Sequence, residues 1–234
     1  MYKEEKIILT NEFVNSDFNE LFKSMYQVFH FPMISTVSIE YKDLELNKFD
    51  FIIFTSKNGV RFFHKKIKNE EILPKIISLG SKTAEFLKKK KFVTHYIAKR
   101  NYSHMMVDEL SKLNNFIGSR VLLVQGNLAQ NSFKEKLNEF CNISRIIVYK
   151  TILNKIKKNN LIELLDKYEC YTVFTSPSCF DAFCLNYNPK KTQIISIGNT
   201  TTNHIVKKGF EPLLTSKMQT YEGICQTVLN YLNS

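Results

Sequence analysis

The sequence lacks any run of about 18 apolar residues, so it contains no candidate transmembrane helix. Its first residues, MYKEEKIILTNEF, have neither a long apolar core nor a small-residue cleavage site, which argues against a signal peptide. We therefore expect a cytoplasmic protein without a membrane partner. With 234 residues and a hydrophobic share of 44%, the chain can bury a sizeable core in one large domain or two small ones.

Residue patterns that hold metals and nucleotides are missing too. No CxxC pair occurs among the five cysteines, and the five histidines show no i, i+4 pair and no adjacent cysteine. We expect reduced, mostly buried thiols and no metal site. Neither GxGxxG nor GxxxxGK[ST] is present, so a nucleotide cofactor is not indicated.

Arginine is scarce in a strongly basic chain. The net charge is +11, yet only four of the 33 basic residues are Arg. A positive charge of this size suggests an anionic partner, which could be a nucleic acid, a membrane surface or a polyanionic small molecule. Because Arg is the preferred side chain for phosphates and base edges, the Lys-rich composition is weaker evidence for nucleic-acid binding than the charge alone suggests.

Six short apolar runs predict buried strands. They are rich in β-branched residues, and several are followed by Ser, Thr, Asn or Gly and then by a helical pattern. The order strand, polar turn, helix is typical of an α/β fold with parallel strands. The predicted strands are KIILT (6–10), DFIIF (50–54), KIISL (75–79), RVLLV (120–124), YTVF (171–174) and QIISI (193–197).

Parts of the sequence occur twice. FTSKNGVRFF returns as FTSPSCFDAF after 120 residues, SLGSKTAEFL returns as SIGNTTTNHI after 118, and KIILTNEFVNSDF returns more weakly as VLLVQGNLAQNSF after 115. Three offsets near half the chain length predict a duplicated α/β unit. Two longer strands of mixed polarity, at about 33–42 and 144–153, lie at the same place in each repeat and suit strands that cross between domains.

Hydroxyl, amide and glycine groups follow the predicted strands. Ligands of parallel sheets bind at the carboxyl ends of the strands, where the next helix offers N–H groups and a positive dipole end to anions. Any single Ser, Thr or Asn turn is more often a helix N-cap than a ligand site. Five such turns on one edge predict a broad anion-binding rim. Its candidate binding residues are Ser56, Lys57, Asn58, Gly80, Ser81, Lys82, Thr83, Gly126, Asn127, Ser176, Ser178, Gly198, Asn199, Thr200 and Thr201.

Tyr149 lies in the second predicted crossing strand, SRIIVYKTIL. A half-buried strand aromatic is the usual role of such a residue. The alternative is a phenol directed into a cleft between domains, as a hydrogen-bond donor or general acid. Spacing alone leaves both roles open.

Seven short motifs follow one another over nearly the whole chain: FTSxNGV, LGSKTAEFL, VLLVQGN, VYKT, FTSPS, IGNTTT and TYEGI. No single motif is specific, but their order, their spacing and the total length together resemble the uroporphyrinogen-III synthase family. Some positions depart from the family pattern. Thr202 stands where the family usually has Ala, and Lys57 and Arg61 have no counterparts in Pro177 and Asp181.

The resemblance implies an α/β fold of two flavodoxin-like parallel-sheet domains, related by internal duplication and joined by a two-stranded β ladder. Residues 1–35 and 150–234 would form the first domain, and residues 42–146 the second. The crossing strands would lie at about 33–42 and 144–153.

The resemblance also implies a reaction. The substrate would be hydroxymethylbilane, a linear tetrapyrrole with eight carboxylates, which is closed to uroporphyrinogen III with inversion of ring D in haem biosynthesis. Loss of water gives an azafulvene cation, and a spiro intermediate then fragments and re-closes. No metal or organic cofactor is implied, and the enzyme would be a cytoplasmic monomer. A transient contact with the enzyme that forms hydroxymethylbilane is a further expectation.

Residue roles carry over by position. Tyr149 matches the family's favoured proton donor to the leaving hydroxyl. Threonines facing the cleft are matched by Thr83, Thr200 and Thr201. The remaining matches are the serine turns at Ser56, Ser176 and Ser178, the GN turn at Gly126 and Asn127, and the C-terminal helix start at Thr220, which is a further candidate substrate-binding residue.

A second hypothesis is a non-catalytic two-domain module that binds small anions or nucleic acid. The duplication and the positive charge suit such a module as well. Single-strand binders stack bases on exposed aromatic side chains, whereas the strand ends here are rich in hydroxyls and glycine. We therefore do not expect nucleic acid as the partner.

Overall fold

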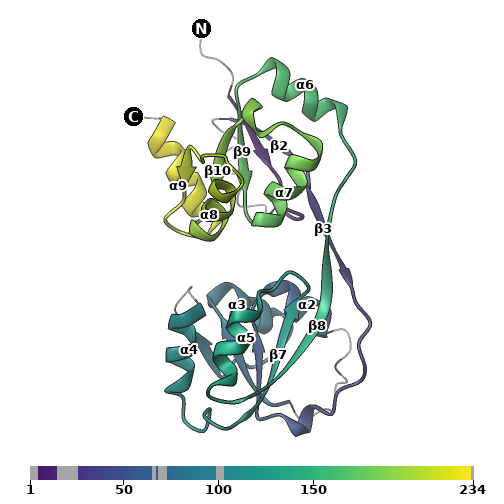
Figure 1. Ribbon diagram of the computed structural model, residues 1–234, viewed down its shortest axis with the longest axis vertical. Coiled ribbons are helices and arrows are strands. Elements are labelled where there is room, and N and C mark those ends of the chain that lie inside the picture. The colour runs from purple at the N-terminus through teal and green to yellow at the C-terminus, as the bar shows by residue number, and fades with distance from the viewer. Residues whose placement is uncertain (1–4, 15–25, 65–66, 68–72, 99–102, 233–234) are drawn as a thin grey trace. The chain divides into compact units, whose positions relative to one another are not determined.

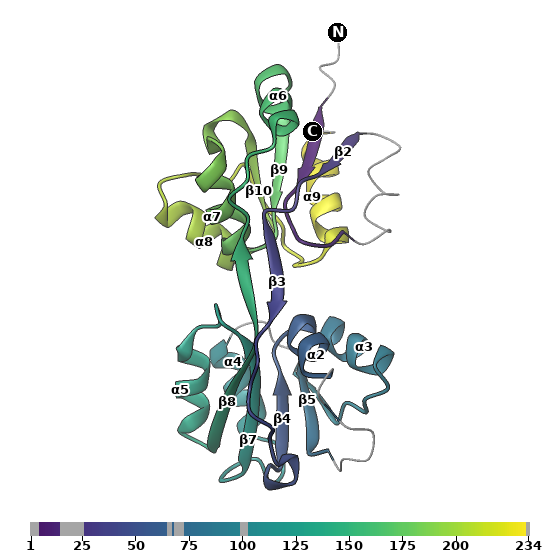
Figure 2. The ribbon, with the colours of Figure 1, turned by 90° about the vertical axis from the view of Figure 1, so that its right-hand side faces the viewer.

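The computed structural model describes residues 5–14, 26–64, 67, 73–98 and 103–232. The chain divides into two compact units (Figure 1). Unit 1 combines Met1–Ser35 with Ile152–Ser234, and unit 2 is Thr36–Thr151. Each unit holds a sheet of mainly parallel strands with helices on both faces (Figure 2). The predicted α/β fold with parallel strands is confirmed.

The sheet of unit 1 has the order β11-β10-β9-β1-β2. Its neighbouring strands are all parallel. β9 is the central strand, and β1 lies beside it with Ile7 between Val28 and Tyr171. The strands are β1 (Lys6–Leu9), β2 (Gln27–His30), β9 (Cys170–Phe174), β10 (Gln193–Ser196) and β11 (Leu214–Thr215).

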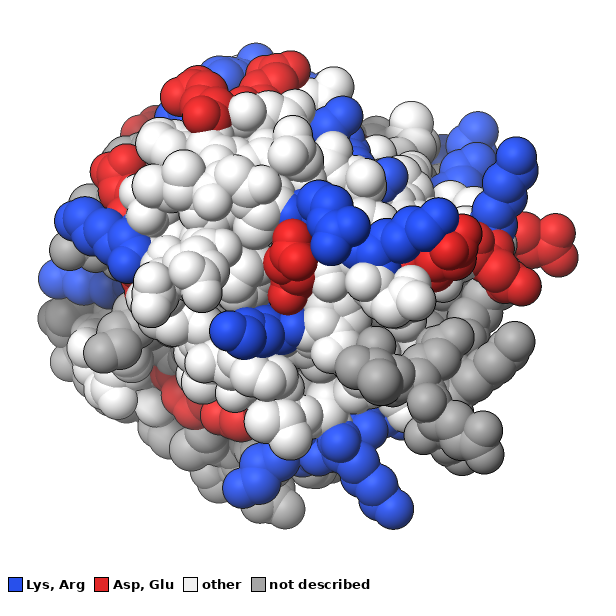
Figure 3. All heavy atoms as spheres, turned by 90° about the horizontal axis from the view of Figure 1, so that it is seen from below, with Lys and Arg blue, Asp and Glu red and all other residues white. Residues whose placement is uncertain are grey.

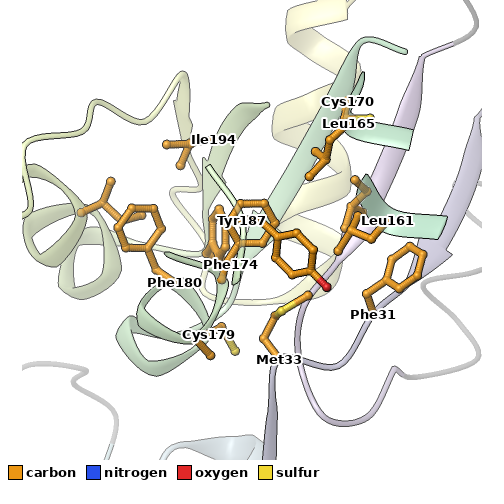
Figure 4. Packing of buried hydrophobic residues seen from close by; sticks show 14 residues of the cluster. Phe31, Met33, Leu161, Leu165, Cys170, Phe174, Cys179, Phe180, Tyr187 and Ile194 are labelled. Carbon is orange, nitrogen blue, oxygen red and sulfur yellow. The ribbon is translucent and has the colours of Figure 1, made fainter. Parts of the chain in front are cut away.

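Helices cover both faces of this sheet. On one face lie α6 (Asn159–Lys167), α7 (Pro177–Asn186) and α8 (Asn199–Lys207), and on the other lies α9 (Tyr221–Leu232); a short 3-10 helix, η2, spans Pro189–Lys191. The α7 face is aromatic (Figure 4). Phe174 contacts Phe180 and Phe183 edge to face at centroid distances of 5.1 and 5.3 Å. Such pairs stabilise a core beyond simple burial.

The sheet of unit 2 has the order β3-β8-β7-β4-β5-β6. The five strands from β8 to β6 are parallel. At the edge, the Asn154 N–H donates to Met33 O and the Ile39 N–H to Val148 O, so β3 runs antiparallel to β8. The strands are β3 (Ile34–Ser38), β4 (Phe51–Phe54), β5 (Lys75–Leu79), β6 (Tyr96–Ala98), β7 (Arg120–Gly126) and β8 (Asn142–Leu153).

The helices of unit 2 also lie on both faces of their sheet. On one face α2 (Lys57–His64) buries Val60, Phe62 and Phe63, beside α3 (Ser81–Lys89). On the other face lie α4 (Ser103–Ser111) and α5 (Asn131–Asn138). A short 3-10 helix, η1 (Leu46–Lys48), precedes β4. The inner strands β4, β5 and β7 are therefore largely buried on both faces, which explains their nearly continuous apolar sequences.

All six predicted buried strands are confirmed, with ends within two residues of the prediction. β2, β6 and β11 were not predicted as such strands. They are short and carry partly exposed residues, so they lack the apolar run that marks a central strand. The strand predicted at about 33–42 is shorter in the structure. It ends at Ser38, and residues 39–42 form an irregular segment.

Thiols follow the prediction of mostly buried cysteines: Cys184 is exposed, and the other four are buried. In the described part of the chain, no helix is both long and apolar enough to cross a membrane. Among the same residues, no group of three or more His, Cys, Asp or Glu side chains could hold a metal ion.

Candidate functional site

Tyr149 lies at the carboxyl edge of the unit 2 sheet, where a β-bulge sets its direction. Gln125 pairs with Ile147, but Gly126 pairs with Tyr149, so β8 carries one extra residue, Val148. Without this bulge Gly126 would face Val148. Bulges commonly re-aim a side chain next to a functional site. Here the bulge directs the phenol toward the α2 face of the sheet.

Three neighbours hold the Tyr149 ring. Its centroid lies 5.5 Å from that of Phe62, and the two rings are stacked at 20°. The ring also covers Gly126 so closely that a Cβ there would lie 2.3 Å from Tyr149 Cζ. The phenolic oxygen lies 3.4 Å from Ser56 Oγ. We call Tyr149, Ser56, Phe62 and Gly126 the phenol site; sequence reasoning found no role for Phe62.

Ser56 also caps α2. Its Oγ accepts a hydrogen bond from the Gly59 N–H at 3.1 Å. The hydroxyl proton of Ser56 is therefore available to the Tyr149 oxygen, which would leave the phenolic proton to point elsewhere. Lys57 and Asn58, in the same turn, are exposed and half-buried. The FTS turn of unit 2 thus places a hydroxyl beside the phenol.

Asn127 fixes the main chain from Tyr149 to Thr151. Its N–H donates to Tyr149 O at 3.1 Å, and its side-chain Oδ1 accepts from the Thr151 N–H at 2.8 Å. The GN turn, predicted as a binding turn, therefore also has a positioning role. Gly126 lies beneath the phenol, and Asn127 ties β7 to β8.

The helix starts after β5 and β10 correspond between the units. Gly80 is the N-cap of α3, and Gly198 is the N-cap of α8. Because both are glycines, neither offers a side chain that could hydrogen-bond to the free N–H groups of the helix. Thr83 and Thr201, three residues on, are only 5% and 2% exposed, so they lie inside their units. The exposed side chains of these turns are those of Ser81, Lys82, Asn199 and Thr200.

The remaining unit 1 residues include further caps. Ser176 Oγ accepts from the Cys179 N–H at 3.3 Å and lies 2.9 Å from Ser178 Oγ. Thr220 Oγ1 accepts from the Gly223 N–H at 2.9 Å, where α9 begins. The cap role is thus present at both residues, as it is at Ser56 in unit 2.

Sequence reasoning missed a hydroxyl cluster in unit 1. Thr202 Oγ1 lies 2.7 Å from Thr215 Oγ1, and both hydrogen-bond to the buried Ser196 hydroxyl. Thr202 was noted only as a departure from a family pattern. The link to Thr215 depends on the pairing of β10 with β11, which local sequence does not reveal.

Tyr221 is a second tyrosine near a strand end. Burial, with a smaller contribution from Cys179, raises its pKa to about 12. Its hydroxyl accepts a hydrogen bond from the Asn11 amide and donates to Phe13 O at 3.3 Å. This phenol therefore stays neutral at physiological pH.

A hollow lies at the opposite edge of the unit 1 sheet. Its volume is about 640 Å³, and it is lined by residues 166–170 and 190–193 at the amino ends of β9 and β10. None of the predicted site residues lines it. Because ligands of open parallel sheets bind at the carboxyl ends, we do not assign this hollow to the site.

The fold and these residues define an α/β protein with hydroxyl-bearing strand ends in both units. The solved uroporphyrinogen-III synthetase of Helicobacter pylori matches the fold with a TM-score of 0.69 at 20% identity, covering 97% of this chain and 99% of that one. A mutant uroporphyrinogen III synthase of Thermus thermophilus gives 0.63 at 15% identity, with 97% and 98% covered.

The family model described as uroporphyrinogen-III synthase HemD matches residues 18–226, so the chain belongs to the uroporphyrinogen-III synthase family. A candidate uroporphyrinogen-III synthase of Methanocaldococcus jannaschii is 26% identical over 245 aligned positions, covering 95% of this chain and 97% of that protein. The family is one of cyclising lyases in tetrapyrrole biosynthesis, as the sequence motifs predicted.

Proposed function

We propose that this chain converts hydroxymethylbilane to uroporphyrinogen III, closing the macrocycle with inversion of ring D. The family match over residues 18–226 carries the proposal. The phenol site supports it with a chemical group of the right kind, because a phenol can give a proton to a leaving hydroxyl. No described feature favours the non-catalytic alternative. Figure 3 shows Lys and Arg interspersed with Asp and Glu, not one continuous basic surface, on the face it presents.

Tyr149 is the proposed proton donor. The bond between the hydroxymethyl carbon and its oxygen breaks, the oxygen takes the phenolic proton and leaves as water, and an azafulvene cation remains. Ser56 Oγ lies 3.4 Å from the phenolic oxygen and can hydrogen-bond to it as the phenol loses its proton. Because the substrate loses its hydroxyl readily, holding ring D in the productive orientation contributes much of the catalysis.

The strand-end turns are the proposed carboxylate ligands. Helix starts without a side-chain cap, at Gly80 and Gly198, offer backbone donors and a positive dipole end to an anion. The exposed side chains of Ser81 and Thr200 beside them, and of Lys57 at the start of α2, add further donors. A substrate with eight carboxylates needs donors of this kind, and a net charge of +11 attracts it from solution.

We further propose that the two units are flavodoxin-like domains related by duplication, with β3 and β8 as the connecting ladder. The strand registers support this. Tyr171 pairs with Ile7 and Gln193, and Phe51, which lies 120 residues before Tyr171, pairs with Val121 and Lys75. Under this correspondence Ile7 matches Val121, an offset of 114, one residue from the 115 expected from sequence.

The proposed setting is a cytoplasmic monomer that acts on a linear tetrapyrrole and meets the hydroxymethylbilane-forming enzyme transiently. A coupled assay tests the function. Hydroxymethylbilane is generated in situ, the protein is added, the products are oxidised, and type I and type III uroporphyrins are separated. We expect predominantly type III. Type I alone, the spontaneous product, from a folded sample would refute the proposal.

A further inference from the structure

Two buried amide side chains have an oxygen that no donor reaches. Asn11 follows β1 in unit 1 and is 7% exposed, and Gln125 lies in β7 of unit 2 and is 4% exposed. Among the residues that the structure describes, Asn11 Oδ1 and Gln125 Oε1 are buried without a hydrogen-bond partner. Leaving a buried acceptor unpaired destabilises the fold, so each such oxygen calls for an explanation.

The orientation of the Asn11 amide follows from its neighbours. Asn11 Nδ2 donates to Phe13 O and to the Tyr221 hydroxyl. A main-chain carbonyl oxygen can only accept, so the nitrogen of the amide must face Phe13 O. Turning the amide over would set two oxygens against each other. Oδ1 is therefore the atom left without a partner.

Gln125 stands at the matching place in the other unit. The registers equate Ile7 of β1 with Val121 of β7, because they pair with Tyr171 and Phe51 of the repeated strand. Asn11 and Gln125 each lie four residues further on, at the carboxyl end of the strand. One unpaired amide oxygen at the same position of both sheets is hard to attribute to a local packing defect.

We propose that Asn11 and Gln125 accept hydrogen bonds from pyrrole N–H groups of the tetrapyrrole, an inference that rests on the proposed function. Besides its single hydroxymethyl group, the substrate has two kinds of polar group. Its carboxylates need donors, which the strand-end turns offer, whereas its pyrrole N–H groups need acceptors. An amide oxygen can only accept. Both oxygens are enclosed, so the groups that cover them must separate before an N–H arrives, and binding then relieves the cost of the unpaired state.

The Gln125→Met variant tests the proposal in unit 2. Met keeps the side-chain length and removes the unpaired oxygen. We expect the KM for hydroxymethylbilane to rise about threefold to tenfold, the effect of one hydrogen bond, with kcat nearly unchanged. The melting temperature should stay the same or rise, since no internal hydrogen bond of that oxygen is lost. A purely structural role would instead lower the melting temperature and leave KM unchanged.

Asn11→Leu tests unit 1, with Asn186→Leu as the matched control. Asn186 is also a buried amide, but its Nδ2 donates to Asn154 O and Ala182 O. Both variants lose internal hydrogen bonds, so both should melt at a lower temperature. Only Asn11→Leu should raise KM. A rise no larger than that of Asn186→Leu would overturn the proposal for Asn11.

Uroporphyrinogen III retains its pyrrole N–H groups, so its binding can be measured by calorimetry. This measurement distinguishes failure of the proposed function from failure of the acceptor role alone. A folded wild type that forms no type III product and binds no tetrapyrrole refutes the proposed function. Wild-type activity combined with unchanged KM and Kd in both Gln125→Met and Asn11→Leu refutes only the acceptor role. Weaker binding by both variants supports it.

Discussion

At the scale of single residues, the phenol of Tyr149 is the chemical group on which the proposed mechanism depends. Phe62 is stacked against its ring, Gly126 lies beneath it, and Ser56 lies 3.4 Å from its oxygen. The sequence could single out Tyr149 and Ser56, because both lie in recognisable motifs. It could not show that Gly126 serves Tyr149, because that contact depends on a bulge between two paired strands.

Replacing Tyr149 by Phe removes the hydroxyl and keeps the ring. We expect type III formation to slow by about 10- to 100-fold. This loss is no larger than the smallest rate enhancements usual for a general acid, because the substrate loses its hydroxyl easily. Because the ring contacts with Phe62 and Gly126 remain, the unfolding midpoint should change little. Turnover is measured in the coupled assay and stability by urea unfolding. Normal turnover in a folded Tyr149→Phe sample would remove the phenol from the mechanism.

Replacing Gly126 by Ala places a methyl group within 2.3 Å of Tyr149 Cζ. The ring must move, and overpacking of this kind costs about 1–3 kcal/mol. We expect lower stability and slower type III formation. A double-mutant cycle with Tyr149→Ala isolates the contact, because Gly126→Ala should cost much less once the ring is gone. An equal cost in both backgrounds would show that the ring is not the cause.

At the scale of elements, sequence reasoning succeeded where a strand is buried on both faces. β4 and β7 are apolar along nearly their whole length, and the prediction found them. β2 and β11 escaped it because edge strands need not be apolar. For a single serine or threonine turn, the sequence could not show whether the side chain caps its helix or binds a ligand, because one side chain at a helix start suits both roles.

Thr220 is predicted to stabilise α9 as its N-cap. Its Oγ1 accepts from the Gly223 N–H at 2.9 Å. Thr220→Ala should lower the free energy of unfolding by about 1 kcal/mol, the usual effect of a lost cap, and Thr220→Ser should retain most of it. Urea unfolding of the three proteins measures both differences. If Ser loses as much as Ala, the hydroxyl cap is not what the threonine contributes.

At the scale of the whole molecule, buried acids of high pKa make the fold sensitive to alkali. Burial raises the pKa of Cys141 and Cys170 to about 11 and that of Cys225 to about 12. It likewise raises the pKa of Tyr41 and Tyr171 to about 12. These groups remain neutral inside the folded chain under conditions where exposed thiols and phenols already lose protons.

Stability is therefore expected to fall in alkali. Unfolding returns the thiols and phenols to their ordinary pKa values of 9.0 and 10.0, so above these the unfolded chain binds fewer protons than the folded chain. Stability should be fully present below pH 9 and decline as pH rises toward 12. Urea midpoints across this range, with tyrosinate absorbance as a second probe, measure it. A midpoint that stays constant or rises would contradict the expectation.

The pairing of β1 with β9 has a consequence for how the protein is made. Lys6 pairs with Cys170, so β1 leaves the ribosome long before its neighbour β9 exists. At typical synthesis rates the interval is roughly 8–30 s. Unit 2, which is continuous from Thr36 to Thr151, is synthesised entirely within that interval. The edge of KIIL that pairs with β9 therefore has to remain open in the nascent chain while the second unit is made, although its other neighbour, β2, is made early, and this edge is where we expect a chaperone to matter most.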